Sequence, residues 1–261
     1  MTLASTGRKA VLAVVCLAAS IGMGAVGTVA NAVTSTPSYG HIDGSKTGSI
    51  IIHKHEHQNG TSDTGTPDGT DNITTPGIDG VTFTVYKVNG LDLTQTNSWD
   101  GLKDYQVPSD TIASSTLTIN NKKYTLTEQG DPVVTANGGL ATAGDLPVGA
   151  YVVIETAHPA NVVDIAQPFL VTIPYPDNQG TSATNGWLYD VNVYPKNGTT
   201  TIKKTVSPQG DLGLGSVASF PTTTDIPAIA DNASFSYYMV SDPMDSRLTN
   251  VTASSVTVGG T

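Results

Sequence analysis

Short runs of alternating apolar and polar residues, separated by turns rich in Gly, Asn, Thr and Pro, recur along this chain and restrict it to β-structure. The clearest run extends from Trp187 to Asn197. Aromatic and β-branched residues alternate through it, as in a half-buried strand. Val191, Val193 and Asn197 share the parity that is expected to face the core. Lys196 has the opposite parity and is expected to face outward, either as an ordinary solvated strand end or as a presented nucleophile.

The strand-like runs have a spacing that is typical of an antiparallel β-sandwich, and no window has a convincing helical period. In the first part of the chain they cover residues 48–55, 80–88, 116–119, 124–127, 151–156 and 168–174. From Thr199 the pattern restarts, with runs at 200–206, 220–226 and 233–240. The sequence therefore predicts two all-β domains in tandem.

The expected domain organisation follows from these runs. Residues 33–47 have the composition of a flexible arm, residues 48–198 form a first β-sandwich, and residues 199–261 begin a second one. The second unit is short for a stable sandwich, so we expect it to be incomplete.

Composition and charge exclude one large class of partners. The 12 basic residues are outnumbered by 22 acidic ones, for a net charge of −10. Nucleic-acid binding requires a basic stripe, which this chain lacks. The charge suits an exported surface protein instead.

Residues 1–32 are predicted to be a secretory signal peptide. Arg8 and Lys9 precede an apolar run at residues 10–21, and Ala30-Asn31-Ala32 is a small-residue cleavage site. A retained membrane anchor is the alternative, although glycines interrupt the apolar stretch. The single cysteine, Cys16, lies inside this segment, so the exported chain would contain no disulfide.

Three polar residues fall on the apolar parity of expected strands: Lys54, Glu155 and Asn197. A buried unpaired charge costs several kcal/mol. The three could be partly exposed strand ends, could form a buried salt bridge, or could react covalently. In a desolvated site a neutral amine can attack the Asn carboxamide while a protonated acid polarises the carbonyl, and ammonia leaves. The product is a Lys–Asn isopeptide between the first and last strands of the domain.

At this point the chain resembles the sortase-assembled major pilins of Gram-positive bacteria. The run from Trp187 matches their pilin motif, Trp-x-x-x-Val-x-Val-Tyr-Pro-Lys, and the motif residues are Trp187, Val191, Val193, Tyr194, Pro195 and Lys196. The run Tyr151 to Pro159 is similar to the E-box pattern Tyr-x-Leu-x-Glu-Thr-x-Ala-Pro, with Val153 in place of Leu and His158 before the Pro.

The resemblance implies immunoglobulin-like sandwiches of the collagen-adhesin B-type and a cell-surface, wall-linked location. It implies that Lys196 accepts the C-terminus of another subunit in a reaction catalysed by a pilin-specific sortase. It also implies that Lys204 and the acid Asp242 belong to an isopeptide site of the second domain. Other pilin subunits would be the main partners, with host surface or matrix ligands as further candidates. The family's Leu-Pro-x-Thr-Gly sorting signal is absent from the sequence.

Other functions compete with this expectation. A wall-anchored adhesin that is not a shaft subunit is the main alternative, although it has no need of an acceptor lysine. His53, His55 and His57 alternate along one strand and could bind zinc, but no carboxylate or Cys pattern completes the shell. A hydrolase lacks a Gly-x-Ser-x-Gly elbow. We expect no cofactor, no metal and no enzymatic turnover beyond isopeptide formation itself.

Overall fold

The structure is a computed structural model that describes residues 42–57, 65–71, 73–177, 186–207, 210, 214–229 and 234–259. The expected signal peptide, with Cys16, and most of the expected arm lie outside the described residues. The chain divides into two compact units. In the first unit the last described residue is 229, and in the second unit the first described residue is 234. Each unit is described by itself.

The first sheet is built around β1 (Thr47–His53), which is the central strand of three. β7 (Leu140–Pro147) pairs with it antiparallel, and β13 (Asp190–Val193) pairs with it parallel. The first and last strands of the domain are therefore neighbours, and Ile50 lies opposite Val191. Because parallel neighbours need a long crossover connection, the rest of the domain lies between them in sequence. In this pair the sandwich departs from the expected antiparallel pattern.

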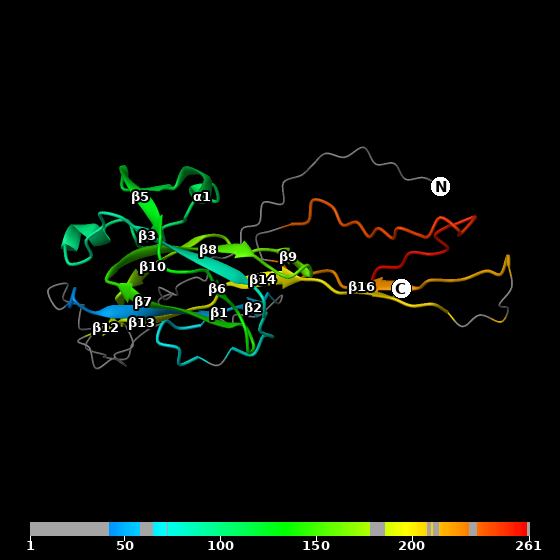
Figure 1. Cartoon of the computed structure of the whole chain (residues 1–261), viewed down its shortest axis with the longest axis horizontal. Coiled ribbons are helices and arrows are strands. Elements are labelled where there is room, and N and C mark those ends of the chain that lie inside the picture. The colour runs from blue at the N-terminus through cyan, green and yellow to red at the C-terminus, as the bar shows by residue number, and fades with distance from the viewer. Residues whose placement is uncertain are drawn as a thin grey trace. The chain divides into compact units, whose positions relative to one another are not determined.

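The second sheet is antiparallel and contains the E-box strand, β8 (Gly149–Ala157). β8 lies between β10 (Phe169–Ile173) and β3 (Thr82–Val88). Beyond β3 the sheet continues with β5 (Lys122–Glu128), labelled in Figure 1, and β4 (Thr116–Ile119). The short strand β6 (Val133–Val134) also pairs with β3.

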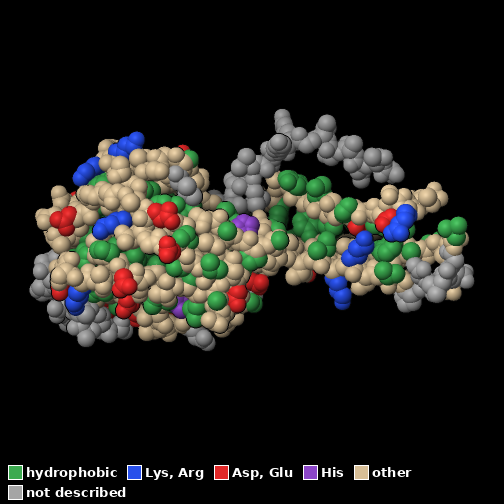
Figure 2. Space-filling view, in the orientation of Figure 1, with side chains coloured by type: hydrophobic (Ala, Val, Ile, Leu, Met, Phe, Trp, Pro, Cys, Tyr) green, Lys and Arg blue, Asp and Glu red, His purple; other side chains and the backbone are tan. Residues whose placement is uncertain are grey.

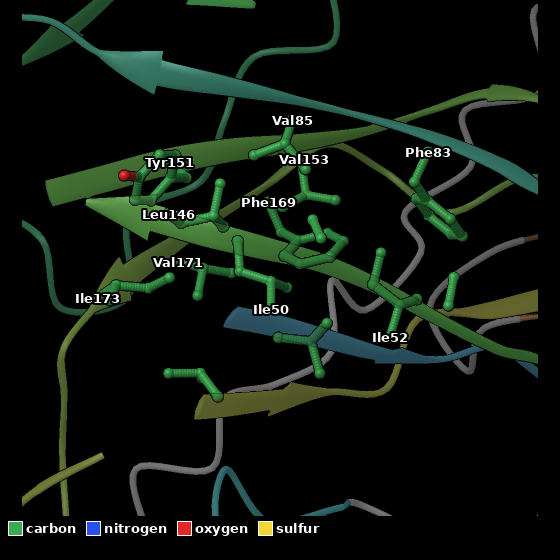
Figure 3. Packing of buried hydrophobic residues seen from close by; sticks show 14 of the residues in the cluster. Ile50, Ile52, Phe83, Val85, Leu146, Tyr151, Val153, Phe169, Val171 and Ile173 are labelled. Carbon is green, nitrogen blue, oxygen red and sulfur yellow. The ribbon is translucent and has the colours of Figure 1, made fainter. Parts of the chain in front are cut away.

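The main core lies between these two sheets. Ile50 and Ile52 of β1 are completely buried, and in Figure 3 their side chains point toward Val153 and Phe169 of the facing sheet. Most of this cluster consists of side chains of alternate parity on β1, β3, β8, β10 and β13. The alternation read from the sequence is therefore the alternation that fills the core.

A second apolar cluster covers the other face of the β8 sheet. Val152 and Ile154, which have the opposite parity to Val153, pack there against residues of the 88–107 segment and of β4. This segment contains the 3-10 helix η2 (Thr96–Trp99) and precedes the one-turn helix α1 (Thr111–Ser114). The sequence predicted no helix, and both helices are too short to produce an apolar period.

Three short strands form a separate small sheet. β14 (Lys196–Thr199) lies between β2 (His55–Glu56), with which it is parallel, and β9 (Val162–Asp164), with which it is antiparallel. Another pair, β11 (Tyr175–Pro176) and β12 (Trp187–Leu188), is antiparallel. These short strands position the candidate site.

Beyond residue 199 the described structure contains one strand pair, β15 (Ile202–Lys204) with β16 (Thr222–Thr224). Both are shorter than the predicted runs. The prediction of a strand at 233–240 is wrong for the described residues 234–240, which do not form a strand. Tyr237 and Met239 are exposed there, so this segment has neither the ladder nor the burial that stabilises a strand.

The fold class predicted from the sequence is confirmed, because the described domain is all-β and its core lies between sheets. Among the described residues, no helix is long and apolar enough to cross a membrane. Figure 2 shows Lys and Arg side chains dispersed among acidic ones on the face in view, as expected for a net acidic surface.

Candidate functional site

Lys54 follows β1 directly and continues the buried parity of Ile50 and Ile52, with no exposed surface. Its backbone is held on both sides, because its N–H donates to the Gly139 carbonyl and its own carbonyl accepts from Ile78 N–H. Gly139 has a φ of +88°, and a Cβ there would lie 2.1 Å from the Lys54 carbonyl oxygen. A glycine is therefore required where the chain passes this close to Lys54.

Glu155 and Asn197 reach the same point from two other strands. Glu155 continues the face of β8 that carries Tyr151 and Val153. Asn197 lies on β14, four residues after Val193 of β13 and with the same parity. Glu155 is 8% exposed and Asn197 is fully buried. The three polar residues that the sequence placed on apolar faces are thus brought together inside the domain.

The three side chains are in mutual contact. Lys54 Nζ lies 3.1 Å from Glu155 Oε2 and donates a hydrogen bond to Asn197 Oδ1. Asn197 Nδ2 donates to Glu155 Oε1 at 2.7 Å. The carboxyl group therefore bridges the amine nitrogen and the amide nitrogen, one with each oxygen.

A backbone group completes the cluster. Ala166 N–H, on the loop between β9 and β10, donates to Asn197 Oδ1 at 2.8 Å and lies 3.3 Å from Glu155 Oε2. An aromatic ring lies next to the amine, since the Phe83 ring centroid is 5.7 Å from Lys54 Nζ. Ala166 was not predicted from the sequence, since a backbone donor leaves no signal in residue type.

This arrangement brings a nucleophile, an electrophile and an acid within hydrogen-bonding distance of one another, with all three side chains buried. An amine can attack a carboxamide carbon when its proton has an acceptor and the leaving nitrogen has a donor. Glu155 contacts both nitrogens and can serve in both roles. The same contacts would equally be made by a buried, hydrogen-bonded ion pair.

The other motif residues have contacts of their own. Trp187 is fully buried, and its ring centroid lies 5.2 Å from that of Trp99 with the ring planes tilted by 42°, a contact that the sequence did not predict. Tyr194 is buried and stacks on His53 with ring centroids 4.6 Å apart. Pro195 N-terminally borders β14, where Lys196 is half-buried and its neighbour Asn197 is fully buried.

Part of the loop between β2 and β3, within residues 65–71, lies against the motif strand. Asn192 N–H donates to the Pro67 carbonyl at 2.9 Å, and a Cβ at Gly65 would overlap the Tyr194 ring at 2.1 Å. Burial, followed by the nearby charges of Asp71 and Asp68, raises the pKa of Tyr194 to about 12.

The two residues expected to serve the second domain fall in different units. Lys204 ends β15, is exposed, and has its Nζ 4.9 Å from the Phe220 ring centroid. Asp242 is exposed in an irregular part of the other unit. A shared site for Lys204 and Asp242 stays a prediction.

The alternating histidines have separate partners. His53 Nε2 lies 2.7 Å from Asn192 Oδ1, and His55 Nδ1 lies 2.7 Å from the Thr75 carbonyl oxygen. Among the described residues, no group of three or more His, Cys, Asp or Glu side chains could hold a metal ion.

Fold and site together define the class: an all-β domain whose first and last strands lie side by side, with a Lys–Glu–Asn cluster across them and a Pro-Lys strand end. Residues 45–198 match the family described as Gram-positive pilin subunit D1, N-terminal domain. The chain belongs to this family of pilin subunits.

Curated relatives and a solved structure agree with this assignment. The chain is 36% identical over 263 residues to fimbrial subunit type 2 of Actinomyces naeslundii, covering 98% of this chain and 48% of that protein. It is 31% identical over 225 residues to fimbrial subunit type 1 of Actinomyces viscosus, covering 83% and 39%. The full-length major pilin SpaD of Corynebacterium diphtheriae superposes with a TM-score of 0.53 at 27% identity, over 73% of this chain and 41% of that one. The chain thus spans about half or less of these relatives' length.

Proposed function

We propose that the protein is a structural subunit of a covalently polymerised cell-surface pilus, and that the amine of Lys196 accepts the C-terminus of another subunit in a sortase-catalysed transpeptidation. Sortase would present that C-terminus as a thioester, and Lys196 Nζ would displace the enzyme's thiol to form an amide. The protein itself would not turn over substrate. Its location would be the outside of the cell, in a wall-linked fibre.

The observation that carries this proposal is the pilin motif at the strand end. Lys196 adjoins Pro195 at the start of β14 and is half-buried, whereas the next residue is fully buried in the core. The two side chains therefore leave the strand in opposite directions. Membership of the pilin family supports the same role.

The test is polymerisation in cells that carry the pilin sortase and the full-length subunit. We expect Lys196→Ala to abolish the high-molecular-weight ladder on a denaturing gel, while the monomer is still exported and folded. Lys196→Arg keeps the charge but is a poor nucleophile, so it should fail equally. Lys203→Ala, at an exposed position on β15, is the matched control and should polymerise. A Lys196→Ala ladder equal to wild type would refute the acceptor role.

We propose secondly that the cluster of Lys54, Glu155 and Asn197 closes to an intradomain isopeptide. Neutral Lys54 Nζ attacks Asn197 Cγ, and the carbonyl electron pair moves to Oδ1. Glu155 gives its proton to Nδ2, the C–N bond breaks, and ammonia leaves. Glu155 then recovers a proton from Nζ, so the reaction consumes only the amine and the amide. The bridging contacts at 3.1 Å and 2.7 Å support this path.

Intact-mass spectrometry of the exported chain tests the closure. The wild type should weigh about 17 Da less than its sequence, the mass of one ammonia, and Glu155→Ala should show no loss. A succinimide at Asn197-Gly198 would give the same mass, so the measurement includes tandem spectra of the peptide that joins Lys54 to Asn197. Lys196→Ala should keep the loss. A wild type at its full sequence mass would sink the intradomain bond and leave the Lys196 proposal standing.

A further inference from the structure

The backbone N–H of Ala166 has no role in the reaction as written above. Ala166 is buried and lies in the four-residue connection between β9 and β10, outside any strand. A buried N–H must find an acceptor, and its contacts are Asn197 Oδ1 at 2.8 Å and Glu155 Oε2 at 3.3 Å. This donor therefore points at the reacting amide and its acid instead of a neighbouring strand.

The contact determines which way the Asn197 amide faces. A backbone N–H can only donate, so the side-chain atom 2.8 Å from it is the oxygen and the other is the nitrogen. Nδ2 is thereby directed to Glu155 Oε1 at 2.7 Å. In the flipped amide the leaving nitrogen would face another donor and would be separated from the acid that must protonate it.

The same donor lies where negative charge would develop. When Lys54 Nζ attacks Cγ, its lone pair points at carbon, so its hydrogen bond to Oδ1 is lost as Oδ1 becomes an oxyanion. Ala166 N–H keeps its position through this step, because it belongs to the backbone. A preorganised donor 2.7–3.1 Å from an oxyanion, in a site without water, is worth about 100-fold or more in rate.

We infer that the Ala166 N–H is a one-donor oxyanion hole for isopeptide closure and that it orients Asn197 for attack. This inference rests on the proposed Lys54–Asn197 bond and adds to it a catalytic group that is independent of side-chain identity. It makes Ala166 replaceable by other small residues but not by a residue without an N–H.

The experiment replaces Ala166 by L-lactic acid through nonsense suppression in cell-free synthesis, which exchanges the N–H for an ester oxygen and retains the methyl group. After translation is stopped, the mass loss of about 17 Da is followed with time in the intact chain. We expect closure about 100-fold slower than in the wild type. The same ester at Ala160, an exposed turn residue, should close at the wild-type rate.

The ester also gives a direct readout of the bond. Mild base cleaves the chain before position 166, separating the fragment with Lys54 from the fragment with Asn197. The two stay together on a denaturing gel only after isopeptide closure. An ester variant that closes as fast as wild type would overturn the Ala166 inference alone. A wild type that never closes would overturn it together with the proposed bond.

A second measurement covers the case in which the ester variant does not fold. In the unreactive Lys54→Met chain, we expect the Ala166 amide proton to be protected from exchange and shifted downfield. Adding Asn197→Leu removes the acceptor and should shift that resonance upfield. A resonance that does not move would show that Ala166 does not contact the amide, and would refute the inference.

Discussion

At the scale of single residues, Tyr194 shows how the motif is enclosed. Its ring lies between His53 and the 65–71 part of the loop, and the side chain is 6% exposed. Among the described residues its buried hydroxyl has no hydrogen-bond partner. Burial in this position disfavours the phenolate, which is why the pKa of Tyr194 is raised from 10.0 to about 12.

This shift predicts a loss of stability in alkali. Between pH 10 and pH 12 the folded protein keeps a Tyr194 proton that the unfolded chain releases, so rising pH favours unfolding. The free energy of unfolding should fall across this range, and Tyr194→Phe should make the fall shallower. Guanidinium titrations at several pH values measure this free energy of unfolding. Tyr237→Phe, at an exposed position, should keep the wild-type slope, and equal slopes for both variants would contradict the prediction.

At the scale of elements, the parallel contact between β1 and β13 depends on a residue without a side chain. A Cβ on Gly48 would lie 2.0 Å from the Tyr189 carbonyl oxygen and 2.9 Å from Ile173 Cγ2. The neighbouring Ser49 N–H donates to the same carbonyl at 3.0 Å. The close approach of the two strands therefore requires glycine at this position.

We expect Gly48→Ala to destabilise the domain by about 1–3 kcal/mol, because backbone must move to admit the methyl group. Gly144→Ala is the matched control, since Gly144 lies on the partner strand β7 and has open space around its Cβ. It should change stability by less than about 0.5 kcal/mol. Thermal or chemical unfolding measures the stability of the two variants. Equal stabilities would contradict the requirement for glycine at position 48.

The strands with clean alternation were predictable, and those without it were not. β1, β3, β8 and β10 were all expected near their observed bounds, because their parity is the parity of the core. β7 was missed because its inward residues include small alanines, Ala141 and Ala143, which give no apolar period. β9 is too short to show a period at all.

At the scale of the whole molecule, the site joins residues that are far apart in sequence. Parity alone indicated that Lys54, Glu155 and Asn197 would face inward. Their meeting also required β2 and β14 to pair in parallel and β8 to face them, which a one-dimensional pattern does not specify. The Ala166 donor could not be predicted, because it depends on the path of a loop.

The bond that we propose has a global consequence for stability. Lys54 and Asn197 are 143 residues apart, so a cross-link should stabilise the fold by about 5 kcal/mol on the chain-entropy model. An apolar triple variant, Lys54→Met with Glu155→Leu and Asn197→Leu, lacks the cross-link and the buried charges. Guanidinium unfolding should find the wild type more stable. If the cluster is an ion pair without a cross-link, the triple variant should be as stable as the wild type or more stable, because apolar replacements of buried charges are often neutral or stabilising.

The adjacency of Lys196 and Asn197 on β14 has a mechanical meaning. In a fibre joined through Lys196, tension would enter the chain at that side chain and continue toward residue 199 and beyond. Most strands of the first sandwich would then lie outside the path of the tension and would bear little of it. Asn197 would be the residue that connects the loaded strand to this unloaded domain. A covalent bond from it to Lys54 would stop a pull on the fibre from peeling β14 off the sheet.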